Sequence, residues 1–146
     1  QQRLEYEKAK GKKMGELSET LIYDTLRDAV LALGLKNIGI LCHYPLSLLI
    51  SNEQMLTEEQ KNFERSSLSH VDLLLFNTIT KQPMLCVEVD GWKFHHTDVQ
   101  KHRDAIKDEI LDKYGLKPAR LSTTSVVTVE TIKEILRQRL LALNLL

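Results

Sequence analysis

Apolar residues recur at helical spacing in three stretches of the chain, and each stretch predicts an amphipathic helix. Gly34 and Gly115 stand just after the first two stretches, where glycine commonly ends a helix. Thr97 or Asp98 stands where the second helix would begin, as a capping residue. Because each helix has a single apolar stripe, each needs another layer to cover it. The predicted helices cover residues 16–33, 98–114 and 128–143.

Shorter apolar runs between these helices predict strands. Pro45 breaks the run over residues 38–50, which favours a strand with an edge position or a bulge there. The polar residues 51–69 that follow predict an insertion. Within it, Thr57 and Gln60 have the spacing of a capping box and predict the start of a short helix.

A hairpin and one further strand complete the predicted sheet. Turn-forming residues 77–83 lie between two apolar runs, which predicts that the runs pair as a hairpin. The resulting order of elements predicts an α/β fold, in which a central mixed β-sheet is flanked by helices on both faces. The strands of this part are expected at 70–76, from Met84 to Asp90, and at 117–121.

Three acidic residues on the predicted hairpin give the strongest indication of chemistry. Glu88 and Asp90 lie two residues apart on one strand, so their side chains share a face about 7 Å apart. Asp72 and Glu88 are equidistant from a hairpin centre near Thr80, which places their Cβ atoms about 5 Å apart. Clustered carboxylates repel one another, and a divalent cation relieves that repulsion. The pattern therefore predicts a metal site suited to phosphodiester hydrolysis.

Composition and charge limit the class of protein. The 146 residues include 20 basic and 20 acidic side chains, and this neutral balance argues against a protein that coats DNA nonspecifically. No apolar run approaches the ~20 residues of a membrane-spanning helix, so no membrane association is expected. Cys42 and Cys86 are expected to be free thiols, which fits a reducing, cytoplasmic setting. Because the first residue is Gln1, the chain is expected to be a fragment of a larger protein.

Five short motifs surround the acidic strand pair. They are Ser18-Glu19, His70-Val71-Asp72, Val87-Glu88-Val89-Asp90-Gly91-x-x-Phe94-His95, Arg103-Asp104-x-x-Lys107-Asp108-Glu109-Ile110-Leu111 and Tyr114-Gly115-Leu116. Their arrangement resembles the PD-(D/E)XK nuclease superfamily, which has the restriction-endonuclease-like fold. The closer resemblance is to the branch of very-short-patch-repair endonucleases and to the family DUF2726. It covers about residues 15–124 and implies one nuclease-like domain over residues 1–146, with the C-terminal helix 128–143 beyond the core.

The resemblance implies a metal-dependent endonuclease that hydrolyses DNA phosphodiester bonds. Asp72 and Glu88 would hold Mg²⁺ or Mn²⁺, supported by Asp90 or by Glu19, which lies on the inward stripe of the first helix. Oxygen ligands favour these ions over zinc. Two of the acids also have ordinary structural explanations, because Asp90 precedes Gly91 as in many turns and Glu19 suits a helix N-terminus.

One position departs from the superfamily pattern. A lysine normally stands two residues after the strand acid, where it helps to orient or deprotonate the attacking water, and this chain has Asp90 there. Lys107, Lys93 and His95 are the candidates to replace it. If none of them does so, the domain has lost catalysis. Lys107 also has a structural alternative, as a surface lysine that is solvated or paired with a neighbouring acid.

The resemblance implies DNA as the partner, with Arg103 and Lys93 in contact with it. Similar domains occur in larger proteins, which implies a fused helicase-like or other DNA-processing domain. The alternative is a catalytically inactive nuclease-like module that binds nucleic acid or a protein partner. A third reading is a structural dimerisation domain that uses the leucine-rich C-terminal helix. His43, His70 and His102 have no metal-ligand spacing in the sequence and are assigned no role.

Overall fold

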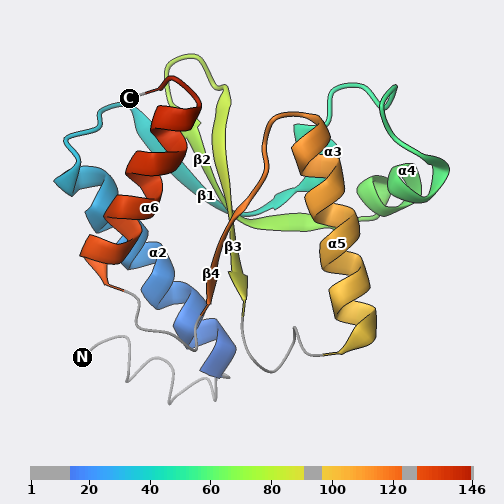
Figure 1. The fold of residues 1–146 in the computed structure, drawn as a ribbon, viewed down its shortest axis with the longest axis horizontal. Helices are drawn as coiled ribbons and strands as arrows, with labels where there is room; N and C mark the ends of the chain where they lie inside the picture. Colours follow the sequence, from blue (N-terminus) through green and yellow to red (C-terminus); the bar gives the residue numbers. More distant parts are fainter. Residues whose placement is uncertain (1–13, 91–96, 123–127, 146) are drawn as a thin grey trace.

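The structure combines one β-sheet with helices on both of its faces (Figure 1). The computed structural model describes residues 14–90, 97–122 and 128–145, with the side chains of residues 14–19 left out of the description. None of the helices described is long and apolar enough to cross a membrane. The elements are α2 (Met14–Ala32), β1 (Ile38–Pro45), α3 (Leu46–Leu49), α4 (Glu58–Arg65), β2 (His70–Asn77), β3 (Pro83–Asp90), α5 (Asp98–Lys113), β4 (Ala119–Ser122) and α6 (Val129–Ala142).

The described strands form a four-stranded mixed sheet in the order β1-β2-β3-β4. The pairs β1/β2 and β2/β3 are antiparallel, whereas β3 and β4 are parallel. The last regular pair at the open end of the hairpin is Leu73 with Val87, so the next positions along the two strands are Asp72 and Glu88. The predicted fold class and the predicted register of the hairpin are therefore confirmed.

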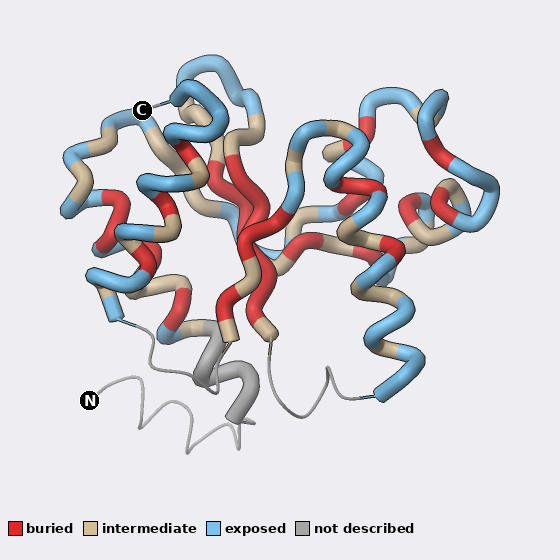
Figure 2. The backbone as a smooth tube through the Cα atoms, in the orientation of Figure 1, coloured by how far each residue is buried: buried red, intermediate tan, exposed pale blue. Residues whose placement is uncertain are grey.

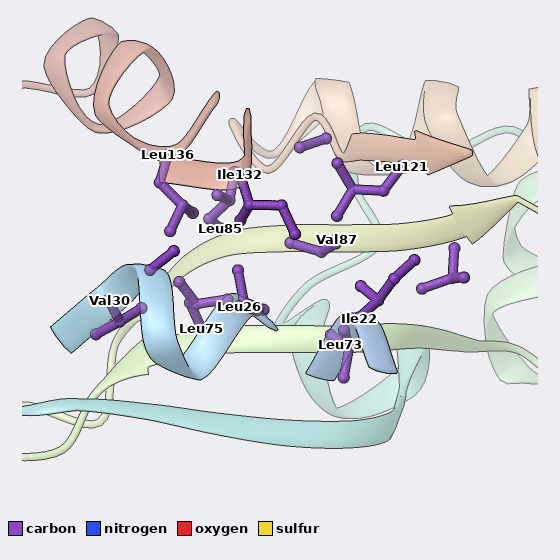
Figure 3. Close-up of a cluster of buried hydrophobic side chains, with 13 residues drawn as sticks. Ile22, Leu26, Val30, Leu73, Leu75, Leu85, Val87, Leu121, Ile132 and Leu136 are labelled. Carbon is purple, nitrogen blue, oxygen red and sulfur yellow. The ribbon is translucent and has the colours of Figure 1, made fainter. Parts of the chain in front are cut away.

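Two apolar clusters lie on opposite sides of the sheet, and Figure 2 shows that the buried residues concentrate along the strands and on the inner sides of the helices. Helices α2 and α6 cover one side, where their leucine and isoleucine side chains meet those of the strands (Figure 3). Helices α3 and α5 and the segment before α4 cover the other. The first cluster includes Ile22, Leu26, Leu73, Leu75, Val87, Ile132 and Leu136, and the second includes Leu46, Val71, Leu74, Cys86, Ile110 and Leu111.

The helix ends follow the local signals in the sequence. Thr57 caps α4 in a full capping box with Gln60, and the Thr97 side chain caps α5 by accepting a hydrogen bond from a backbone N–H. Gly34 and Gly115 follow α2 and α5 with φ of +70° and +74°, the left-handed conformation that glycine adopts without strain. These predicted boundaries are confirmed.

Two details of the predicted elements are wrong. The run over residues 38–50 is not a single strand, because β1 ends at Pro45 and α3 begins at Leu46. The predicted edge position is confirmed, because β1 is an edge strand, and the Leu46 N–H donates to the Ser69 carbonyl at 3.0 Å in the same register as the pair Pro45–His70 before the chain turns into α3. The apolar stripe of the predicted helix 98–114 would include Val99, but Val99 is 72% exposed, because the first turn of α5 lies beyond the second apolar cluster.

The paired strands β1 and β2 change faces part way along their length. In β1, Ile40 packs against the first cluster and Tyr44 against the second. In β2, Leu73 belongs to the first cluster and Val71 to the second. Residues separated by an even number of positions share a face in a regular strand, so both strands turn over between these residues.

His43 and Asp72 occupy the point at which this two-stranded ribbon turns over. The pairs Cys42–Leu73 and Tyr44–Val71 are regular on either side and leave His43 opposite Asp72. His43 has a φ of +51°, in the left-handed region that residues other than glycine seldom adopt. The turn therefore places a histidine and an acid side by side at the junction of the two layers.

Candidate functional site

Asp72 and Glu88 lie where β2 and β3 separate, and each carboxylate bonds the backbone of the other strand. The Asp72 N–H donates to Glu88 Oε2 at 2.8 Å, and the Val89 N–H donates to Asp72 Oδ2 at 2.8 Å. These side-chain oxygens take the acceptor role that carbonyls have in the regular part of the ladder. The two acids are thus held next to each other by their own strands.

Glu88 is an acid in an environment that disfavours its charge. Glu88 is only 1% exposed, and this burial raises the pKa of its carboxyl group to about 7. The negative charge of Asp72 also raises this pKa. Lys107 and the Asp72 N–H act in the opposite direction. A cation placed at this carboxylate would offset the cost of burying its charge.

Lys107 reaches this acid from the helix on the same side of the sheet. Its Nζ contacts Glu88 Oε1, and its side chain is 13% exposed. The neighbouring acids on α5 have other hydrogen bonds, since Asp104 accepts from Gln100 and Glu109 accepts from Gln60. The structural alternative, in which Lys107 is a surface lysine that is solvated or paired with a neighbouring acid, is therefore wrong, because its Nζ contacts the buried acid instead.

Asp90 is held in a separate ion-pair network. Arg120 donates to Asp90 Oδ1 at 2.7 Å and to Asp108 Oδ1 at 2.6 Å. Burial disfavours the guanidinium charge, but the hydrogen bond to Asp108 and the charge of Asp90 outweigh it and raise the pKa of Arg120. Asp90 therefore faces an arginine, whereas Asp72 and Glu88 bond each other's strands.

Arg120 was missed in the sequence, although its strand carries a usable signal. It lies between Ala119 and Leu121, which are both buried in the first cluster, so strand alternation directs Arg120 to the opposite face. That face is the one on which Glu88 and Asp90 lie, and parallel pairing puts Arg120 beside Glu88 in the sheet. A basic residue between two apolar residues of a short predicted strand was the available clue.

A second group of side chains meets at the turn of the β1–β2 ribbon. The potential ligand atoms of His43, His70 and Asp72 all lie within 4.8 Å of one another. The two imidazole rings are edge to face, with centroids 4.9 Å apart, and His70 Nε2 is 3.8 Å from Asp72 Oδ1. Burial lowers the pKa of His70, and the proximity of His43 lowers it further.

His43 and His70 have no metal-ligand spacing in the sequence and were assigned no role, but the fold brings them together. His43 comes from β1 and His70 from β2, so only the pairing of the strands brings them together. Part of the group was visible in the sequence, since His70 and Asp72 have the two-residue spacing of side chains that share a strand face.

The other predicted site residues lie elsewhere or outside the described residues. Arg103 lies on α5 with its guanidinium carbon 4.9 Å from the centre of the Phe63 ring, an aromatic contact with α4. Glu19 lies within α2, but its side chain is outside the description. Lys93 and His95 belong to residues 91–96, which are also outside it. Among the predicted residues, the structure brings together Asp72, Glu88 and Lys107.

The fold and the site define a mixed α/β protein with a buried carboxylate–lysine pair beside a second acid. The chain belongs to the family DUF2726, described as a protein family of unknown function, whose model matches residues 12–140. That match runs from α2 into α6 and includes every residue of the two groups described above. No curated protein and no solved structure matches the chain significantly.

Proposed function

We propose that this domain is a metal-dependent deoxyribonuclease of the PD-(D/E)XK type, in the branch related to very-short-patch-repair endonucleases. The observation that supports this most is the contact between Lys107 Nζ and the buried carboxylate of Glu88, next to Asp72. The superfamily combines two strand acids with one lysine. Here the lysine comes from α5 in place of the strand position that Asp90 occupies.

The donor atoms at this site fit Mg²⁺ or Mn²⁺. Asp72 and Glu88 offer only carboxylate oxygens, and Mg²⁺ is commonly bound by one or two carboxylates together with waters and substrate phosphates. Burial also disfavours the negative charge of Glu88, and a cation bound there would offset that cost. A bound ion of this kind supplies a water of lowered pKa and neutralises charge on the phosphate.

The residues of the chain have separate roles in the proposed reaction. Asp72 and Glu88 hold the cation, while Lys107 orients the attacking water and stabilises the charge that develops on the phosphate. Arg120 holds Asp90 through an ion pair, so Asp90 supports the site without being its main ligand. His95 and Glu19 stay predicted contributors to the site, and Lys93 and Arg103 stay predicted DNA contacts. A fused DNA-processing domain, such as a helicase-like one, is the proposed partner.

One observation favours the second candidate, a nuclease-like module that binds nucleic acid or a protein without cleavage. Both oxygens of Glu88 already have partners, because Oε1 contacts Lys107 and Oε2 accepts from the Asp72 N–H. Asp90 is paired with Arg120 as well. A site closed in this way could be a structural ion-pair network, and measurement of cleavage distinguishes the two functions.

Plasmid cleavage tests the proposal directly. Wild-type protein incubated with supercoiled plasmid and Mn²⁺ or Mg²⁺ is expected to nick or linearise the DNA. Glu88→Gln and Lys107→Met should each lower the rate by about 100-fold or more, the scale of losing a charge-stabilising group in a transition state. Lys101→Gln is the matched control, since Lys101 is an exposed lysine on the same helix.

Two results would contradict the assignment. Equal cleavage by wild type and Glu88→Gln would show that another site, or a contaminant, cuts the DNA. The second result is an absence of cleavage by the wild type together with an absence of Mn²⁺ binding at Glu88. Calorimetry would then give the same result for wild type and Glu88→Gln, and the binding module would replace the nuclease as the proposed function.

A further inference from the structure

His43, His70 and Asp72 form a compact group of nitrogen and oxygen donors at the turn of the β1–β2 ribbon. Their potential ligand atoms lie within 4.8 Å of one another, and His70 Nε2 is 3.8 Å from Asp72 Oδ1. His43 is exposed, whereas His70 and Asp72 are half-buried, so the group is open to solvent on one side. An ion could therefore enter it without unfolding of the sheet.

We propose that this group binds a divalent transition-metal ion such as Zn²⁺, through two imidazoles and one carboxylate. Three such protein ligands with an open fourth position are a common arrangement for zinc, and Mg²⁺ rarely takes imidazole. Neighbouring ligands of a tetrahedral zinc lie roughly 3.4 Å apart, as follows from bond lengths of about 2.0–2.1 Å. A bound ion would draw these atoms together from their present separations, which are all within 4.8 Å.

The backbone at His43 supports the same inference. Its φ of +51° lies in a region that L-residues other than glycine avoid, although the flanking pairs of the ladder are regular. Strained residues of this kind occur preferentially at functional sites. Here the strained residue lies directly opposite Asp72, on the strand next to the one that carries His70.

The zinc site shares Asp72 with the proposed nuclease but does not depend on cleavage. Asp72 Oδ2 accepts from the Val89 N–H of β3, and Oδ1 is the oxygen that lies near His70. The two oxygens thus face different neighbours. Glu88 and Lys107 are not part of the histidine group, so changing them tests the two sites separately.

Metal titration of the whole chain tests this site. Zn²⁺ binding is measured by calorimetry, and Co²⁺ is followed by its visible absorption, which reports nitrogen ligands. His43→Gly and His70→Ala should each weaken binding of both ions at least tenfold and reduce the Co²⁺ absorption. Glycine suits the positive φ of residue 43, so that variant removes the ligand while the backbone keeps its conformation. His102→Ala is the matched control, an exposed histidine 3.5 Å from Glu59 on the surface, and should bind as wild type does.

Glu88→Gln separates this proposal from the proposed function. It should abolish Mn²⁺-dependent cleavage and leave Zn²⁺ and Co²⁺ binding intact. Binding that survives His43→Gly and His70→Ala but is lost in Glu88→Gln would place the ion between the carboxylates and overturn the histidine site, with the nuclease proposal unharmed. Binding that depends on the histidines in a protein that does not cut DNA would support the metal site and refute the nuclease.

Discussion

Glu88 is a buried acid that the fold surrounds with hydrogen-bond donors. Its carboxylate receives the Asp72 N–H on one oxygen and Lys107 on the other. Burial still dominates, and it raises the pKa of Glu88 to about 7. At this one residue, the free energy of folding and the protonation of the site are therefore linked.

The metal-free protein should lose stability as the pH rises through the range set by Glu88. The folded-state pKa of about 7 lies above the ordinary value of 4.5, so the folded state keeps a proton that the unfolded state has released. This contribution is fully present below pH 4.5 and declines up to about pH 7, by at most about 1.4 kcal/mol per pH unit. Urea unfolding in a chelator, at a series of pH values, measures it.

Glu88→Gln should remove this part of the pH dependence, because glutamine does not titrate. The comparison is the difference in unfolding free energy between wild type and variant at each pH, so contributions of other groups cancel. Glu58→Gln, at an exposed position on α4, is the control. If the difference for Glu88→Gln stays constant from pH 4.5 to 7, burial does not raise the pKa of this acid.

At the scale of elements, Arg120 joins three pieces of the fold. It lies on β4, and its guanidinium bonds Asp90 at the end of β3 and Asp108 on α5. β4 is only four residues long, so few backbone hydrogen bonds hold it to the sheet. The charged network is expected to fix both the edge strand and the helix that carries Lys107.

Arg120→Met should therefore destabilise the protein by about 2 kcal/mol, because it leaves two partly buried carboxylates without their common cation. Adding Asp90→Asn and Asp108→Asn to that variant should restore most of the loss, since no unpaired charge then remains. Denaturant unfolding of the single and triple variants measures both changes. Equal destabilisation in the two would mean that packing of the arginine stem, and not charge, is responsible.

At the scale of the whole molecule, the sheet separates two apolar clusters with different tasks. The cluster under α2 and α6 contains no site residue among those described, whereas α5 covers the face on which Glu88 and Lys107 meet. The first cluster therefore contributes mainly stability, and the site lies at the second.

Leu26→Ala should cost about 2–5 kcal/mol of unfolding free energy, because Leu26 is fully buried between α2 and the sheet. Leu31→Ala on the same helix should change it by less than about 0.5 kcal/mol, since Leu31 is 69% exposed. Thermal or urea unfolding gives both values. A similar loss in the two variants would indicate that the outer face of α2 is covered by another surface in solution.

Much of this architecture could be predicted from local pattern, because periodicity and caps depend on neighbours in the chain. The three long helices, their glycine ends and the capping box at Thr57 are of this kind. The opposition of Asp72 and Glu88 followed from the symmetry of a hairpin. The short helix α3 could not be predicted, because a bond from Leu46 to the distant Ser69 fixes its first residue.

The rest of the site depends on contacts between segments far apart in the sequence. The positive φ of His43 arises where two strands turn over together, and no pattern of neighbouring residues in the sequence predicts it. The pairing of Arg120 with Asp90 requires the parallel register of β3 and β4, which a sequence pattern does not specify. In the sequence, Lys107 could equally be solvated or paired with a neighbouring acid, and only the packing of α5 on the sheet brings it to Glu88.

The exchange of side-chain oxygens between β2 and β3 affects how mutants of this protein should be interpreted. Asp72 and Glu88 each close one cross-strand link with an atom that would also bind a cation. Alanine at either position would open the end of the hairpin as well as delete the ligand, so an inactive alanine mutant is ambiguous. Asparagine or glutamine retains an acceptor for the link and lacks the charge, which makes the amide the informative replacement.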